Sequence, residues 1–335
     1  MTGLAIYLVF FLTVASIYAI VVLGLNLQWG YTGLFNAGIV GFYAVGAYGT
    51  AILAGPDRAA LIGGFGLPFP LALFGGMVLS GIAALIVGLA TLRLRGEYLA
   101  ITTFGIAISI QLVALNFESL TGGANGLVGL PRPFADRFDD PDLYGLVFLA
   151  AMLATVGIIY LALEAVVRSP WGRLLNALRE DEVAARALGK NIAAIRLQAF
   201  VLGCMLTGLA GGLYVGFIGF VSPLDFLPIL TFQIWAMLIV GGSGNNAGAL
   251  VGAVTVWGLW TMSGLLISRL VPVGFHAQAG AIQTMLIGLV IVSTLLFRPQ
   301  GMIGERAGGA RFGRSNAPPV AKDRNWSTGG GGQQP

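Results

Sequence analysis

Residues Ser169 to Arg196 read SPWGRLLNALREDEVAARALGKNIAAIR, and long apolar runs flank this polar stretch on both sides. Basic residues are spread along it, whereas its acids, Glu180, Asp181 and Glu182, are adjacent. Acidic side chains at the start of a helix and basic ones at its end complement the helix dipole. The pattern therefore predicts a short helix over Asp181–Leu188.

This predicted helix is too short to be stable alone in water, so it must lie against another surface. Gly189 is its expected C-terminal stop. Its small apolar face consists of Val183, Ala184, Ala187 and Leu188. Two interpretations remain open at this point: a solvated loop between membrane segments, or a docking helix for a soluble partner.

The composition places the rest of the chain in a bilayer. Of its 335 residues, 57% are hydrophobic and 10% are charged, whereas soluble chains carry about a quarter charged residues. One cysteine and one histidine exclude an internal disulfide and leave little metal chemistry. No basic face suited to nucleic acid and no catalytic constellation is visible in the sequence. We therefore expect no enzyme, no catalytic residue and no metal ligand.

The apolar runs predict an all-α, polytopic membrane protein with about nine membrane segments. Phe226–Val240 is short for a full crossing, so re-entrant or broken helices are expected near Gly241–Gly248. The predicted segments are Leu4–Leu25, Tyr31–Leu53, Leu67–Leu92, Tyr98–Asn116, Leu143–Val167, Ala193–Phe220, Phe226–Val240, Ala247–Ile267 and Ala279–Phe297.

The distribution of arginines predicts the orientation. The positive-inside rule places the loop at Arg93 and Arg95, the loop at 168–196 and the C-terminal tail in the cytoplasm. The N-terminus and the loop Glu118–Asp142 are then outside. We divide the chain into a membrane domain, 1–300, and a Gly- and Pro-rich tail, 301–335, expected to be disordered and cytoplasmic.

The chain shows no power source of its own. The interiors of the predicted spans are essentially free of the charged side chains that ion-coupled carriers usually keep within the bilayer, and Glu97 and Glu164 lie near span ends. The glycine-rich Gly241–Gly248 lacks the Lys-Ser/Thr ending of a phosphate-binding loop. A membrane protein of this kind, with a possible docking helix, suggests that a partner supplies the energy.

A series of short stretches, in order, resembles the permease family of branched-chain amino-acid ABC importers, and its LivM-like subunits in particular. These stretches cover nearly the whole membrane part and are Gly30–Leu34, Phe42–Tyr48, Arg95–Ile101, Leu120–Leu127, Ser169–Arg173, Arg179–Ala185, Gly241–Gly248 and Arg298–Gly301.

The resemblance implies an importer in a bacterial inner membrane with two permeases, two cytosolic ATPases and a periplasmic solute-binding protein. Similarity to the LivM-like type implies that the second permease is a different chain. ATP and Mg²⁺ would be used by the ATPases, and no cofactor is expected on this chain. The loop at 168–196 would be the segment that couples to an ATPase. Its candidate coupling residues are Arg179, Glu180, Asp181, Glu182, Ala184, Ala185 and Gly189.

The expected function is uptake of a small neutral or zwitterionic solute, with branched-chain or other hydrophobic amino acids favoured because the spans are uncharged. Urea or an amide is an alternative substrate, and a secondary transporter or facilitator working alone is an alternative mechanism. Asn36 either lines the pathway or joins helices, whereas the helix-joining role is favoured for Gln111 and Asn116. The candidate pathway residues are Gly33, Asn36, Gly38, Gln111 and Asn116.

The chain departs from the family pattern at two places within the possible pathway. Asn36-Ala37-Gly38-Ile39 stands where family members commonly have Ser-Leu-Gly-His. Ile108 and Gln111 stand in the fourth segment where many members carry Glu and Arg. The substrate is therefore less well defined by the resemblance than the machine.

Overall fold

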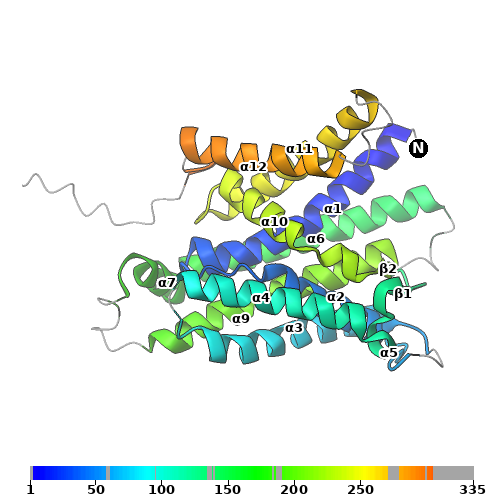
Figure 1. Ribbon diagram of the computed structural model, residues 1–335, viewed down its shortest axis with the longest axis horizontal. Helices are drawn as coiled ribbons and strands as arrows, with labels where there is room; N and C mark the ends of the chain where they lie inside the picture. The colour runs from blue at the N-terminus through cyan, green and yellow to red at the C-terminus, as the bar shows by residue number, and fades with distance from the viewer. Residues whose placement is uncertain are drawn as a thin grey trace, which may run out of the picture. The chain divides into compact units, whose positions relative to one another are not determined.

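The structure, a computed structural model, describes residues 3–57, 61–94, 96–133, 138, 140–182, 185, 191–270, 279–298 and 300–304. Helices dominate these ranges (Figure 1). The α-helices are α1 (Gly3–Leu25), α2 (Ile39–Ala54), α3 (Phe69–Thr91), α4 (Gly96–Asn116), α5 (Glu118–Thr121), α6 (Pro141–Arg168), α7 (Pro170–Glu180), α9 (Ile192–Ile218), α10 (Pro228–Gly241), α11 (Asn246–Leu270) and α12 (Ala279–Phe297). The shorter elements are the π-helix η1 (Asn26–Gly30), the 3-10 helices η2 (Gly123–Asn125) and η4 (Pro223–Phe226), and strands β1 (Leu127–Val128) and β2 (Phe220–Val221), which pair antiparallel.

The predicted membrane segments are present as helices. Within the described part of the chain, six helices are long and apolar enough to cross a membrane, and three apolar helices are shorter. The shorter ones are α2, α10 and the Gly280–Thr294 part of α12. The prediction of a polytopic all-α membrane protein is therefore confirmed.

Helix α10 is too short to cross the bilayer by itself. Its 14 residues rise about 21 Å, whereas the hydrocarbon core is about 30 Å thick. At Gly242 the backbone has a φ of 112°, and the chain turns through residues 242–245 into α11. This geometry agrees with the broken or re-entrant crossing expected at the glycine-rich stretch.

Helices α1 and α9 form the centre of the bundle. Residues Thr13–Leu25 of α1 are buried on every side of the helix, and α9 packs against α1, α2 and α3. Where α2 and α9 cross, a Cβ added to Gly46 would overlap the backbone of Gly208. The glycines allow the two backbones to approach closely.

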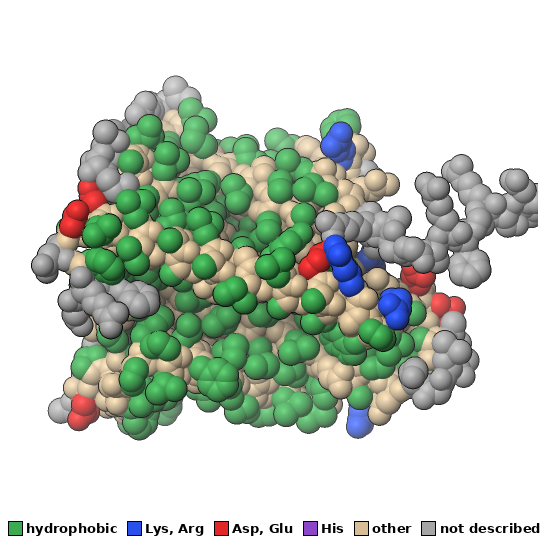
Figure 2. Space-filling view, turned by 180° about the vertical axis from the view of Figure 1, so that it is seen from behind, with side chains coloured by type: hydrophobic (Ala, Val, Ile, Leu, Met, Phe, Trp, Pro, Cys, Tyr) green, Lys and Arg blue, Asp and Glu red, His purple; other side chains and the backbone are tan. Residues whose placement is uncertain are grey.

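The outer surface is apolar. Large hydrophobic side chains are exposed along the outer helices, for example Leu71 (60%), Ile86 (65%) and Ile101 (70%). Figure 2 shows hydrophobic side chains over most of one face, with the basic side chains on that face at one end only. A soluble monomer rarely exposes so large an apolar area, so lipid is the expected neighbour of this surface.

The second predicted segment differs from the structure at its start. It was expected to be helical from Tyr31, but helix α2 begins only at Ile39. The preceding helix does not end at Leu25 but continues through η1, because the side chains of Asn26 and Gln28 are held by other helices. The chain is then irregular over residues 31–38, and these residues are called the break below.

The polar stretch contains a helix that the sequence argument did not predict. Helix α7 begins after Ser169, whose side chain accepts a hydrogen bond from Gly172 N (3.4 Å), and Pro170 occupies its first turn. Its buried face includes Leu175 and Leu178. The serine cap followed by proline was the available signal.

The predicted helix over Asp181–Leu188 lies mostly outside the described residues. Asp181 itself is extended and ends α7, whereas Glu182 and Ala185 have helical conformation.

At the other end of the chain, residues 300–304 are described, and they contact α10. Met302 N donates to Val240 O (2.8 Å) and Ile303 N donates to Gly241 O (3.0 Å). The rest of the expected tail lies outside the described residues.

Candidate functional site

A buried polar cluster holds the break in place. The side-chain amide of Gln28 donates to Phe200 O (2.8 Å) and to Cys204 Sγ (3.2 Å) on α9. Asn36 Nδ2 donates to Gln28 Oε1 (2.9 Å), and Asn36 Oδ1 accepts from Gly38 N (2.9 Å). Gln28, Asn36 and Cys204 are all inaccessible to solvent. Since each amide is bonded, the cluster fixes an irregular backbone within the bundle at little desolvation cost.

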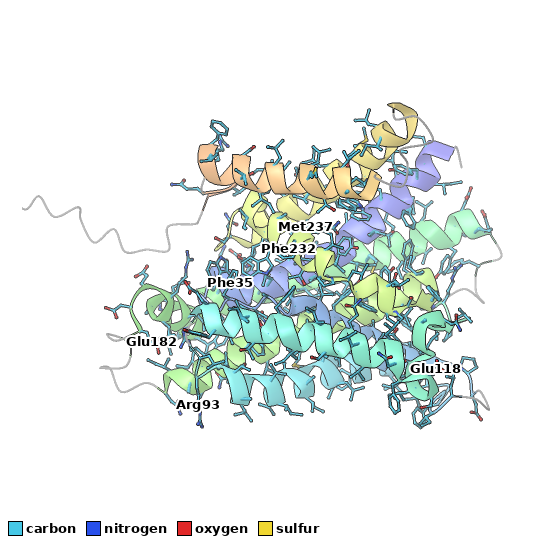
Figure 3. All side chains as sticks on the ribbon, viewed as in Figure 1. Phe35, Arg93, Glu118, Glu182, Phe232 and Met237 are labelled. Atoms are coloured by element: carbon cyan, nitrogen blue, oxygen red, sulfur yellow. The ribbon has the colours of Figure 1, made fainter. Side chains whose placement is uncertain are left out.

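An aromatic pocket of about 530 Å³ lies in front of this cluster. The rings of Trp29, Phe35 and Trp235 meet there, with centroid separations of 5.0 Å (Trp29–Phe35), 5.4 Å (Trp29–Trp235) and 4.4 Å (Phe35–Trp235). Figure 3 labels Phe35, from the break, and Phe232, from α10. The described residues that line the pocket are Trp29, Phe35, Ala37, Ala100, Ile101, Phe104, Thr231, Phe232, Trp235, Ile239, Ser243 and Ile291.

The described residues of the lining include no charged side chain and only two hydroxyl groups, those of Thr231 and Ser243. It therefore offers apolar contacts to a ligand and few groups that could hold a charge. Its rim is open, since Ile101 and Phe232 are 70% and 54% exposed.

The predicted pathway residues have different positions relative to this pocket. The side chain of Asn36 points into the polar cluster, while its backbone oxygen accepts from Trp235 Nε1 (3.3 Å) and so orients a pocket ring. A Cβ on Gly38 would overlap the backbone of Thr103 on α4. Thr103 Oγ1 also accepts a hydrogen bond from Ala37 N (3.1 Å). Asn36 and Gly38 are thus brought together directly behind the pocket wall.

Gln111 and Asn116 lie elsewhere on α4. Gln111 Nε2 donates to Pro223 O in η4 (3.3 Å), which joins two elements. Asn116 is exposed and donates to Leu112 O of its own helix (2.8 Å). Next to Pro223, the carboxylate of Asp225 accepts from Ser222 N (2.9 Å). Burial raises the pKa of Asp225, and the hydrogen bond from Ser222 opposes this shift.

A second polar network ties η1 to the glycine-rich turn. Asn26 Oδ1 accepts from Gly244 N (2.9 Å), and Asn26 Nδ2 donates to Asn246 Oδ1 (3.0 Å). Asn246 Nδ2 in turn donates to Glu164 Oε2 (3.3 Å) at the end of α6. Glu164 also forms an ion pair with Arg168 (2.8 Å). The ends of α6, α11 and η1 therefore share one connected network.

Arg179 connects α7 to the same region. Its guanidinium donates from Nη1 to the backbone oxygen of Gly30, the last residue of η1. Gly33, with a φ of 73°, lies against the Arg179 side chain, and an added Cβ would be 3.4 Å from Arg179 Cγ. Since few side chains adopt this φ, the glycine permits the tight approach. Of the coupling candidates, Arg179 thus contacts the break directly.

The other predicted coupling residues lie farther along the same stretch. Glu180 and Asp181 are exposed. Glu182 forms an ion pair with Arg196 of α9 (3.2 Å), and Ala185 is buried. Ala184 and Gly189 lie outside the described residues.

Residues 7–295 match the family model described as the permease component of branched-chain amino acid transport systems. The chain belongs to this family. Permeases of this family are transport subunits rather than enzymes, and the apolar helices agree with a multi-pass protein of the inner membrane. No solved structure matches the chain with significance.

Several curated permeases are similar to this one. The high-affinity branched-chain amino acid transport system permease protein LivM of Salmonella typhimurium is 33% identical over 87% of this chain and 68% of its own length. The probable branched-chain amino acid transport permease protein LivM of Methanocaldococcus jannaschii is 26% identical over 87% of this chain and 91% of its own. The LivH permease of Salmonella typhimurium is 23% identical over 72% and 80%.

The sequence argument did not identify the aromatic pocket of this permease. Its rings come from three stretches far apart in the chain: the region Trp29–Phe35, Phe104 of α4, and helix α10. The available signal was local: Trp29 precedes the break and Phe35 lies within it, and Phe232 and Trp235 are three apart on α10.

Proposed function

We propose that this chain is the membrane-spanning subunit of an ATP-driven importer for branched-chain or other hydrophobic amino acids. The aromatic pocket beside the break is the observation that carries the proposal. It joins an apolar binding surface to an element that α7 contacts through Arg179. The names of the relatives support the substrate class.

The pocket favours an uncharged side chain as its occupant. A charged group would lose its hydration among Trp29, Phe35 and Trp235 without gaining an ionic partner there. A leucine or isoleucine side chain would instead bury its apolar surface against the aromatic rings. Removing that surface from water is favourable. The hydroxyls of Thr231 and Ser243 are available to orient the amino-acid backbone of the solute.

Energy would enter through the polar stretch. We place this stretch in the cytoplasm, where an ATPase subunit that hydrolyses Mg-ATP would bind it. A movement of α7 would pull on Gly30 through Arg179 and so displace the break, which carries Phe35 on the pocket wall. The pathway would then alternate between outward-open and inward-open forms. This chain itself would supply no catalytic group and hold no cofactor.

A second permease would complete the pathway. The pocket is open at Ile101 and Phe232, which are exposed here. The chain also resembles LivH permeases, which supports a different chain as the partner. A periplasmic solute-binding protein would deliver the solute on the opposite side from the ATPases.

Reconstitution tests this proposal. The purified permease is placed in liposomes alone, and in parallel with its permease partner, ATPases and binding protein. Leucine uptake is measured with and without ATP on the side of the liposome membrane that the ATPases face. The proposal expects uptake only in the complete system with ATP, and competition by isoleucine and valine but not urea. Leucine flux through this chain alone would instead identify a facilitator.

A further inference from the structure

Two neighbouring pockets form one groove between α3 and α9. The first, of about 550 Å³, is lined on these helices by Leu85, Val201 and Leu202. The second, of about 660 Å³, is lined by the end of α3, by Leu92 and Arg93 directly after it, and by the beginning of α9. Leu197 lines both pockets. Since the helices run antiparallel, the pockets lie end to end along them.

The first pocket, called the inner end of the groove below, is suited to hydrocarbon. Its two polar side chains use their polar atoms within the protein: Gln198 Oε1 accepts from Trp171 Nε1 (3.0 Å), and Ser169 Oγ donates to Val166 O (2.6 Å). The remaining surface is aliphatic or aromatic. An apolar chain can therefore lie there while these two polar groups keep their hydrogen bonds.

The second pocket, called the outer end of the groove below, is basic. Among the described residues, the charged side chains in its lining are Arg93, Arg196 and Glu182, two basic and one acidic. Arg93 is exposed, and Figure 3 places it and Glu182 at the same end of the bundle. Arg196 bonds Glu182 (3.2 Å), and its side chain is 23% exposed. An oxyanion could use the exposed part of this guanidinium together with Arg93.

The depth of the groove matches a lipid in one leaflet. From Leu92 to Leu85 the helix rises about 10 Å, and one leaflet contributes about 15 Å of hydrocarbon. A basic group at the membrane surface above an apolar groove is an arrangement that favours anionic lipid head groups. A soluble anion would use only the outer end and leave the apolar end empty.

We propose that this groove binds one anionic phospholipid. Its phosphate lies at Arg93 and Arg196, and one acyl chain follows Leu197 and Val201 to Trp171. Such a lipid would touch both α3 and the first turn of α7, so it would brace the polar stretch against the bundle. This site is separate from the aromatic pocket, and it does not depend on the identity of the transported solute.

The position of Trp171 allows a direct test. The full-length permease is placed in phosphatidylcholine bilayers that contain a small fraction of phosphatidylglycerol with brominated acyl chains. Bromine quenches tryptophan fluorescence at contact, and the Trp171 signal is obtained by subtracting the spectrum of Trp171→Phe. The parallel sample contains brominated phosphatidylcholine at the same fraction. We expect several-fold stronger Trp171 quenching by the anionic lipid.

The head-group contact is tested with arginine variants. Arg93→Gln should abolish most of the preference for phosphatidylglycerol, whereas Arg173→Gln, an exposed arginine on α7 outside the groove lining, should retain it. Size-exclusion chromatography shows that both variants are folded. Equal quenching by the two lipids, or an equal loss of preference in both variants, would overturn the proposal and leave ordinary annular lipid contact.

Discussion

The guanidinium of Arg179, at the end of α7, donates a hydrogen bond to the carbonyl oxygen of Gly30, at the end of the π-helix η1. This contact joins the polar stretch to the break that forms one wall of the aromatic pocket. Hydrogen bonds from charged groups contribute about 1.5–3 kcal/mol, more than neutral ones. Short π-helical segments are often found at functional sites, and here one lies between a possible input of force and a binding surface.

The Asn26 network should be important for stability. Asn26→Ala would leave the Gly244 N–H and the Asn246 side-chain oxygen without their bond to Asn26. An unsatisfied buried group costs about 1–3 kcal/mol, so we expect a clearly lower melting temperature in detergent. Asn116→Ala is the matched control, because the Asn116 side chain is exposed and bonds only its own helix. Equal melting temperatures for the two variants would argue against the network.

Phe232 should contribute to solute affinity. It lines the pocket but is 54% exposed, so Phe232→Ala should fold normally. Loss of an apolar contact of about 1.4 kcal/mol would raise the KM for leucine uptake about tenfold. Phe74→Ala, also on an exposed surface (60%) but outside the pocket lining, should leave the KM unchanged. If both variants behave like the wild type, the pocket does not bind the solute.

Gly46 should tolerate no side chain. In Gly46→Ala the new methyl group would overlap the backbone of Gly208, and backbone cannot rotate away. We therefore expect α2 and α9 to separate and the yield of monodisperse protein to fall sharply. In Gly105→Ala the methyl group would meet no atom within 4 Å, so this variant should purify like the wild type. A normal yield of Gly46→Ala would contradict the close crossing of these helices.

The orientation of the chain can be tested by labelling. The only native cysteine, Cys204, is inaccessible, so single cysteines can be introduced without background. Arg173→Cys on α7 and Glu118→Cys on α5 are both at exposed positions. In intact cells a membrane-impermeant maleimide should label position 118 and spare position 173. Inside-out vesicles should reverse the pattern; the opposite result in both preparations would place the polar stretch outside.

The membrane segments could be predicted from the sequence because burial in lipid requires long apolar runs, and charged residues such as Arg93 and Arg168 mark their ends. Helix α7 was missed because the adjacent acids were interpreted as the start of a helix. The predicted helix was therefore placed after α7. The start of α2 was misplaced because the irregular residues 31–38 depend on distant partners, including Thr103 and Phe200.

The aromatic pocket could not be predicted for a similar reason. Trp29 and Trp235 belong to segments far apart in the chain, and apolar segments contain many aromatics that only contact lipid. Asn36 was a candidate either for lining the pathway or for joining helices. Its bonding to Gln28 and its backbone contact with Trp235 depend on tertiary structure, which the pattern of one sequence does not contain.

The number of leucine molecules transported per ATP hydrolysed, in the reconstituted complex, tests the central claim most directly. Arg179→Ala should leave assembly and ATP hydrolysis largely intact. Loss of its bond to Gly30 should lower this ratio by about tenfold or more, the factor that about 1.5 kcal/mol represents. Arg173→Ala, on the same helix, should keep the wild-type ratio. A wild-type ratio in Arg179→Ala would show that force does not reach the break through this contact.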